Sequence, residues 1–70
     1  MTRIQILKDD LTKQQIRTLM GLEENEQWTD WTIYEDADYI IGETENDSAD
    51  DLMTFLIDEL ELDEDIIEVD

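Results

Sequence analysis

Carboxylates are the main source of chemistry in this sequence, which has 22 Asp and Glu residues among 70 and no histidine or cysteine. Without those two residue types, the chain holds neither a histidine-activated nucleophile nor a Cys/His zinc site. Its one serine, Ser48, precedes a predicted helix and has no base nearby in sequence. Paired carboxylates can act as general acid and base, but they need a substrate pocket, for which so small a domain has little room. The composition therefore favours a protein that is not an enzyme.

Clustered carboxylates could also bind calcium, for which the EF-hand loop sets oxygen ligands at fixed offsets around a central glycine and a final glutamate. A loop that begins at Glu43 has Glu45 and Asp47 at ligand positions. However, Ser48 stands where the glycine belongs and Thr54 where the last glutamate belongs. The sequence therefore predicts no dedicated metal site and no cofactor.

The positive charges are confined to one end of the chain. Residues 1–17 carry all four bases and two acids, a net charge of +2, whereas residues 18–70 carry twenty acids and no base, a net charge of −20. Most domains mix the two signs, because like charges repel one another and destabilise a compact state. We therefore expect a polycationic partner, and we expect the chain to repel nucleic acid and anionic membranes. The basic segment is expected to turn away from that partner.

The overall charge is close to that of a DNA segment as long as the domain is wide. Size scaling predicts a radius of gyration of roughly 11 Å, and hence a diameter of about 28 Å, for a chain of 70 residues. Duplex DNA carries one charge per ~1.7 Å of axis, which gives roughly sixteen charges over that length. The chain carries a net charge of −18. This charge predicts a DNA mimic that occupies the nucleic-acid groove of a DNA-binding protein.

The sequence predicts one α+β domain, residues 1–70, of a cytoplasmic protein; the inhibitor function inferred below would place it in the cytoplasm of a host bacterial cell. Apolar residues make up 40% of the chain and fall in periodic blocks, which argues against disorder despite the high charge. No apolar run reaches membrane-spanning length, and the beginning of the sequence has no signal-peptide pattern. The absence of cysteine fits a reducing compartment.

The expected elements are a strand, a helix, a hairpin, a second helix and a last edge strand, with the helices packed on the sheet. Residues 2–8 alternate like a strand, although their spacing also allows a helix face, and we favour the strand. Residues 11–21 predict the first helix, with Thr12 and Gln15 at capping-box spacing and Gly21 as its stop. Residues 22–30 are loop-like, and the tail either forms an edge strand or frays.

Residues 31–42 predict a β-hairpin, because two runs of β-branched and aromatic residues surround four polar residues. With 35–38 as the loop, Tyr34 lies opposite Tyr39 and Ile33 opposite Ile40. The isoleucine pair then shares one face with Trp31, and the tyrosine pair lies on the other face. Because both faces are partly apolar, we expect helices or a partner on both sides of the sheet.

Residues 47–62 predict the second helix, with Asp47 or Ser48 as its cap and two acids in its first turn. Its apolar residues cluster on one side at helical spacing. The opposite side carries a row of acids that spans about 20 Å at the helical rise per residue. The members of this row are Asp47, Asp50, Asp51, Asp58 and Glu61.

The stretch from Tyr39 to Ser48, YIIGETENDS, resembles a segment of the small anti-CRISPR proteins of Listeria prophages that inhibit Cas9. In that family a Tyr–Val–Ile strand likewise runs into Glu-x-Glu-Asn-x-Ser and a helix, and the likeness covers residues 31–60. The resemblance implies a small acidic α+β DNA mimic whose hairpin loop occupies the PAM-reading site of guide-loaded Cas9. It further implies that Asp36 and Asp38, with Glu35, face the basic residues of that site.

Together these features predict an acidic inhibitor that blocks DNA binding by a basic host protein, such as Cas9, a restriction enzyme or a related nuclease. Two alternatives remain: an acidic protein that neutralises a basic toxin, as immunity proteins and antitoxins do, and a housekeeping domain adapted to high salt. A homodimer also remains open. An exposed aromatic residue, Tyr34, Tyr39 or Trp28, is expected to anchor the contact. The acids expected to contact the partner are Glu35, Asp36, Asp38, Glu43, Glu45, Asp47, Asp50, Asp51 and Asp58.

Overall fold

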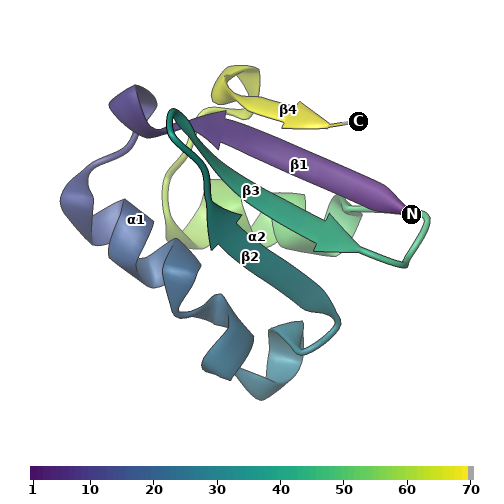
Figure 1. Ribbon diagram of the computed structural model, residues 1–70. Helices are drawn as coiled ribbons and strands as arrows, with labels where there is room; N and C mark the ends of the chain where they lie inside the picture. Colours follow the sequence, from purple (N-terminus) through teal and green to yellow (C-terminus); the bar gives the residue numbers. More distant parts are fainter. Residues whose placement is uncertain (70) are drawn as a thin grey trace.

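A four-stranded antiparallel sheet forms one layer of the fold, and two helices form the other (Figure 1). The computed structural model describes residues 1–69, with residue 23 described by its backbone alone. The strands follow the spatial order β2-β3-β1-β4, so the expected α+β class is confirmed. The elements are β1 (Thr2–Leu7), α1 (Lys13–Met20), β2 (Trp31–Glu35), β3 (Tyr39–Thr44), α2 (Asp50–Glu59) and β4 (Ile67–Val69).

The amino-terminal segment is a strand, as we favoured, and it lies inside the sheet. β1 pairs with β3 on one side and with β4 on the other. Its alternating pattern buries Ile4 and Ile6 against the helices, while Arg3 and Gln5 point to the opposite face. The tail therefore forms a strand rather than fraying, because β1 offers it a second edge to pair with.

The capping box and the glycine stop in the sequence correctly predicted a helix at α1. The Thr12 side chain accepts a hydrogen bond from the Gln15 amide, and the Gln15 side chain accepts one from the Thr12 amide, which completes the expected capping box. The helix ends at Met20 with Gly21 as its C-cap, and it buries Leu19. It is therefore shorter at both ends than the predicted 11–21.

The segment from 22 to 30 contributes to the core, which its polar composition did not indicate. It forms two short 3₁₀ turns, Leu22–Glu24 and Glu26–Trp28, that bury Leu22 and Trp28. The Trp28 side chain is only 3% exposed, and its ring centre lies 5.2 Å from that of Phe55. The expectation that Trp28 could be an exposed anchor is therefore wrong.

The hairpin forms with a register two residues from the predicted one. Tyr34 lies opposite Ile41 and Ile33 opposite Gly42, rather than Tyr39 and Ile40. The expected loop residue Glu35 closes β2, and a three-residue turn follows in which the Asp36 amide donates to the Tyr39 carbonyl at 2.8 Å. A shift of two residues preserves the faces, because the pleat repeats every two residues.

Packing at Gly42 explains the observed register. A Cβ atom at this position would lie 3.2 Å from both Ile33 Cδ1 and Ile4 Cγ1, and 3.4 Å from Trp31 Cε3. Glycine lets these three large side chains meet on the buried face without displacement, whereas a Cβ atom would require the two isoleucine side chains to shift by a few tenths of an ångström. The ladder therefore places Gly42 between Ile33 and Ile4.

Both helices pack on the same face of the sheet, and within residues 1–69 no helix lies over the other face (Figure 1). Leu52 and Leu56 of α2 are fully buried against the sheet. We expected helices or a partner on both faces; among the described residues helices cover one face only, and a partner on the other face stays a prediction. No helix in the described part of the chain is long and apolar enough to cross a membrane.

The second helix is shorter than predicted, which breaks the acidic row. α2 begins at Asp50 after Ala49 as N-cap, while Ser48 Oγ accepts from the Asp50 amide at 3.1 Å. Asp47 therefore lies in the preceding loop. Glu61 lies beyond the end of the helix with a φ of 56°, in the left-handed region. The ten residues of α2 span about 15 Å at the helical rise, not 20 Å.

Candidate acidic interaction surface

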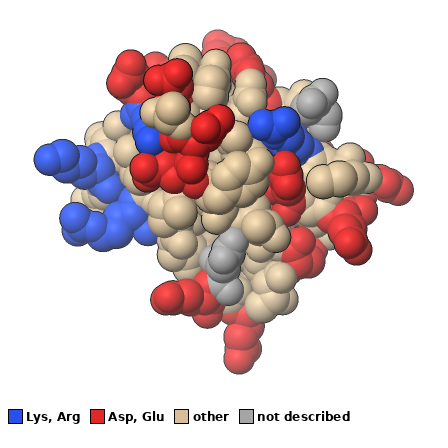
Figure 2. All heavy atoms as spheres, in the orientation of Figure 1, with Lys and Arg blue, Asp and Glu red and all other residues tan. Residues whose placement is uncertain are grey.

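The carboxylates are exposed and mostly uncompensated. Every acidic side chain that the structure describes is exposed except Glu43, which is half-buried. Ion pairs within the described residues involve only Glu35, Glu43 and Asp47. The radius of gyration is 10.8 Å and the extents are 27 × 25 × 24 Å, as the sequence length predicted. Figure 2 shows acidic groups along the top, right and lower edges of this view, while basic groups form the left edge and a further basic group lies near the upper right.

The predicted site residues do not form one patch, because they fall at opposite ends of the sheet. The hairpin acids lie at one end of β3, and the acids that follow β3 lie at the other end. The six residues of β3 separate the two groups by about 20 Å at the strand rise per residue. Of the remaining predicted acids, Glu43 lies within β3 on the helix-free face, and Asp58 lies near the end of α2.

The sheet brings further acids to the hairpin end. The Lys8 amide donates to the Asp38 carbonyl at 2.9 Å, so the 3₁₀ turn Lys8–Asp10 lies beside the hairpin turn. The pairing of Ile6 with Ile67 places the 3₁₀ turn Glu64–Ile66 at the same end (Figure 1). We call the resulting surface the hairpin-end rim. It consists of Asp9, Asp10, Glu35, Asp36, Asp38, Glu64 and Asp65.

Four members of this rim were not among the predicted site residues: Asp9, Asp10, Glu64 and Asp65. The first two belong to the segment expected to turn away from the partner. The sequence signal for Asp9 and Asp10 was an Asp-Asp pair after a predicted strand. That signal places the pair beside the hairpin turn only if β1 is known to lie next to β3. Lys8 is the base within the rim, and its Nζ lies 3.0 Å from Glu35 Oε2. Glu35 is therefore paired internally, whereas Asp36 and Asp38 form no ion pair among the described residues.

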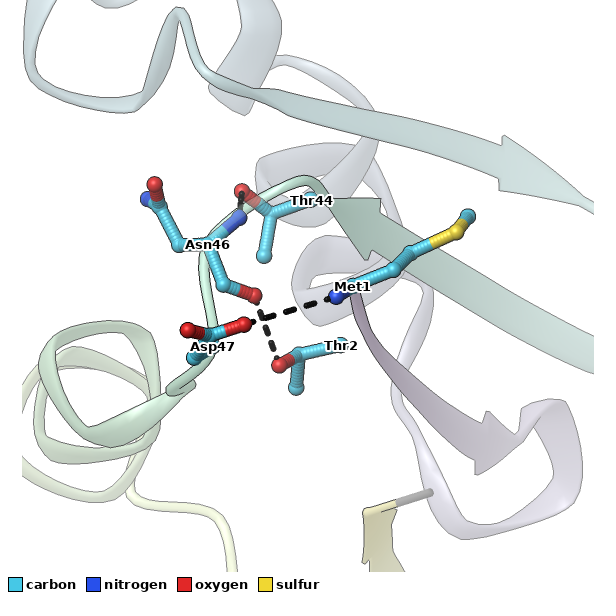
Figure 3. Close-up of polar contacts among 5 residues, drawn as sticks. All are labelled: Met1, Thr2, Thr44, Asn46 and Asp47. Atoms are coloured by element: carbon cyan, nitrogen blue, oxygen red, sulfur yellow. Dashed lines mark hydrogen bonds and ion pairs between the residues drawn. The ribbon is translucent and has the colours of Figure 1, made fainter.

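The opposite end of the sheet is held by a hydrogen-bond network (Figure 3). Thr2 Oγ1 donates to the Asn46 carbonyl at 2.8 Å, and the Asn46 amide donates to Thr44 Oγ1 at 3.3 Å. The amino group of Met1 lies 3.7 Å from Asp47 Oδ1, and both groups are well exposed. Buried Thr2 and Thr44 fix this loop. We call the acids that surround it the loop-end rim: Asp30, Glu45, Asp47, Asp50 and Asp51.

The helix-free face of the sheet is covered by its own side chains. Ile41 lies on this face and is only 2% exposed. The Tyr34 hydroxyl donates to Glu43 Oε1 at 3.0 Å, and Arg3 Nε lies 4.0 Å from the same carboxylate. The hydrogen bond to Glu43 raises the pKa of Tyr34 above its usual value, and desolvation adds to this effect. The two predicted tyrosine anchors lie here, with Tyr34 exposed and Tyr39 half-buried.

These surfaces present a high density of exposed carboxylates. Among the described residues, no group of three or more acids is arranged to hold a metal ion. The rims can form charge-assisted hydrogen bonds with arginine and lysine side chains. No protein-family model, curated protein or solved structure matched the chain in comparisons with known proteins.

Proposed function

We propose that this protein is an acidic inhibitor that mimics DNA and blocks the nucleic-acid groove of a basic host protein. The observation that carries the proposal is the exposure of nearly all described carboxylates on a packed scaffold. The net charge of −18 belongs to a body 27 Å long, over which duplex DNA carries roughly sixteen charges. Both the amount of charge and the length over which it is spread therefore support mimicry.

The hairpin-end rim is the surface we assign to the contact. Seven carboxylates and one base, Lys8, lie across the ends of four strands, a width of about 14 Å at the usual strand spacing. Backbone hydrogen bonds connect β1 to the hairpin turn, so the backbone that carries Asp9, Asp10, Asp36 and Asp38 is ordered before binding. The resemblance noted in the sequence also favours Asp36 and Asp38. The loop-end rim would extend the contact along a longer groove.

The partner we propose is a defence nuclease such as Cas9 or a restriction enzyme. Such proteins hold the phosphate backbone with lysine and arginine side chains. Carboxylates that occupy those side chains would exclude DNA by competition. Association would be fast and steered by charge, and added salt would weaken it.

Duplex cleavage by purified enzymes tests the proposal directly. Guide-loaded Cas9 and a panel of restriction endonucleases are each titrated with the protein at several duplex concentrations. Inhibition of at least one enzyme is expected, and added duplex or salt should relieve it. If the protein is added after the duplex has bound, it should have a much smaller effect. Inhibition that duplex cannot relieve, or inhibition of none of the enzymes, would contradict the proposal and favour the toxin-neutralising alternative.

Two variants with the same change in charge test the location of the contact. Asp36→Asn with Asp38→Asn removes two charges from the hairpin-end rim, and the asparagine at 36 can still accept from the Ala37 amide as Asp36 does. Glu24→Gln with Glu26→Gln removes two exposed charges from the 3₁₀ turns on the helix side. We expect the first variant to weaken inhibition tenfold or more, since charge-assisted pairs contribute about 1.5–3 kcal/mol each. Equal effects of the two variants would show that total charge matters and the rim does not.

A further inference from the structure

Tyr34 presents an aromatic ring on the face of the sheet that carries no helix in residues 1–69 (Figure 1). The side chain is 37% exposed, whereas Ile41, directly opposite in the ladder, is only 2% exposed. With no helix over this face, neighbouring side chains must exclude water from Ile41. Tyr34 is the neighbour directly opposite Ile41 in the ladder, and part of its side chain remains open to solvent.

A hydrogen bond fixes this ring in advance. The Tyr34 hydroxyl donates to Glu43 Oε1 at 3.0 Å, and Arg3 Nε lies 4.0 Å from that carboxylate oxygen. A ring held in this way loses little conformational freedom when a partner binds. Tyrosine anchors are effective in protein interfaces for the same reason.

The chemistry around the ring is that of a cation site. The Glu43 carboxylate accepts the hydrogen bond of the Tyr34 hydroxyl, and Asp36 adds a second negative charge that acts on this hydroxyl, while the Arg3 guanidinium opposes both. The two carboxylates outnumber the one base at this position. An aromatic face attracts cations through its quadrupole. A planar, weakly hydrated guanidinium can stack on the ring and still pair with a carboxylate, whereas a compact ammonium group is strongly hydrated and cannot stack. Exposed Leu7 and half-buried Tyr39 continue the same face towards the hairpin turn.

We propose that the Tyr34 face is a docking surface for arginine, in preference to lysine, side chains of a basic partner. Two observations support this proposal: the carboxylates beside the ring are complementary in charge to arginine, and a hydrogen bond holds the ring in place. The inference rests on the proposed function only in taking the partner to be basic. It adds that the contact continues from the hairpin-end rim onto the sheet and that it discriminates between the two cationic residues.

Deca-arginine and deca-lysine peptides are suitable probes, and calorimetric titration measures their affinities for the intact chain. We expect the arginine peptide to bind more tightly than the lysine peptide. Tyr34→Leu should lower the affinity for the arginine peptide about two- to fivefold and leave that for the lysine peptide nearly unchanged. Tyr34→Phe keeps the ring and should largely keep the preference. Ile57→Ala, at a similarly exposed apolar position on α2, is the matched control and should retain the wild-type preference.

A preference for arginine that survives Tyr34→Leu would overturn the inference, because carboxylates alone would then account for it. Wild-type protein with the arginine peptide provides a second test that needs no folded variant. Nuclear Overhauser contacts between the Tyr34 ring and arginine side chains support the inference, and contacts only at the acidic rims overturn it. Competition with duplex DNA is measured separately, so the proposed function can stand while this inference fails, or fail while this one stands.

Discussion

The backbone at the end of α2 predicts that replacing one glutamate by glycine will stabilise the protein. Glu61 has a φ of 56° and is the one residue other than glycine with a positive φ in the described chain. The turn it makes lets the Leu62 amide donate to the Leu56 carbonyl at 3.2 Å, and Leu62 is buried. The left-handed conformation costs a residue with a Cβ atom roughly 1–2 kcal/mol, and glycine avoids this cost.

The expected gain is smaller than the strain, because glycine also gives the unfolded chain more freedom. That entropic effect costs about 0.5–1 kcal/mol, so the net gain for Glu61→Gly is about 0.5–1 kcal/mol. A gain of this size corresponds to an increase in Tm of about 2–8 °C in so small a domain. Thermal unfolding followed by circular dichroism, with urea unfolding as a second measurement, checks both quantities.

Removing a negative charge from so acidic a protein is itself stabilising, so the comparison needs a control for charge. Glu61→Ala removes the same charge but keeps the Cβ atom, and the glycine variant should be the more stable of the two. Within α2 the order should reverse, because Asp58→Gly should be less stable than Asp58→Ala by about 1 kcal/mol. If glycine and alanine at position 61 give equal stability, the backbone at this position is not strained and the reasoning is refuted.

Four further expectations concern packing and charge. Leu56→Ala should lower the free energy of unfolding by about 2–5 kcal/mol in urea, because this side chain is fully buried; a loss below about 1 kcal/mol would contradict that burial. Gly42→Val should cost about 1–3 kcal/mol, because even a Cβ atom would lie 3.2 Å from Ile33 and Ile4; an unchanged urea midpoint would contradict the close approach. The chain has two tyrosines, so Tyr39→Phe leaves Tyr34 as the one that absorbance titration follows. Its ionisation midpoint should lie above pH 10.0, and Glu43→Gln should lower that midpoint. The stability that the raised pKa of Tyr34 contributes is present below pH 10 and is lost as the pH rises through the raised value. Raising NaCl from about 0.05 to about 0.5 M should increase Tm, because salt screens the repulsion between carboxylates. Circular dichroism should still show a folded protein at the lower salt concentration. A domain adapted to high salt would be unfolded at that lower concentration.

The elements of this fold were largely predictable because their signals are local. The Thr12–Gln15 capping box lies within four residues, and the alternation of Ile4 and Ile6 lies within three. The hairpin faces were predictable for the same reason, since alternation assigns them whatever the register. The register was not predictable, because it depends on how Gly42 fits between Ile33 on one neighbouring strand and Ile4 on the other.

The candidate site was harder to predict than the fold, because it depends on which strands are neighbours. Asp36 and Asp38 could be placed at a hairpin tip from sequence alone. That Asp9 and Asp10 lie beside them follows from the β1–β3 pairing, and that Glu64 and Asp65 lie at the same end follows from the β1–β4 pairing. These are contacts between distant segments. The sequence instead predicted a row of acids along one face of the second helix. Because α2 extends only from Asp50 to Glu59, Asp47 and Glu61 lie outside it and the row is incomplete.

The central position of β1 gives the charge asymmetry a structural meaning. β1 lies between β3 and β4, which place Glu43 and Glu68 on the helix-free face. Like charges crowded on one sheet face destabilise it, and β1 supplies Arg3 beside Glu43 and Gln5 as a donor to Glu68. These groups, with Lys8 beside Glu35, therefore relieve repulsion within the sheet while leaving most of the acids at its two ends uncompensated. A need for hydration alone would not require this division. This division supports the proposal that the free carboxylates at the two ends of the sheet bind a basic partner.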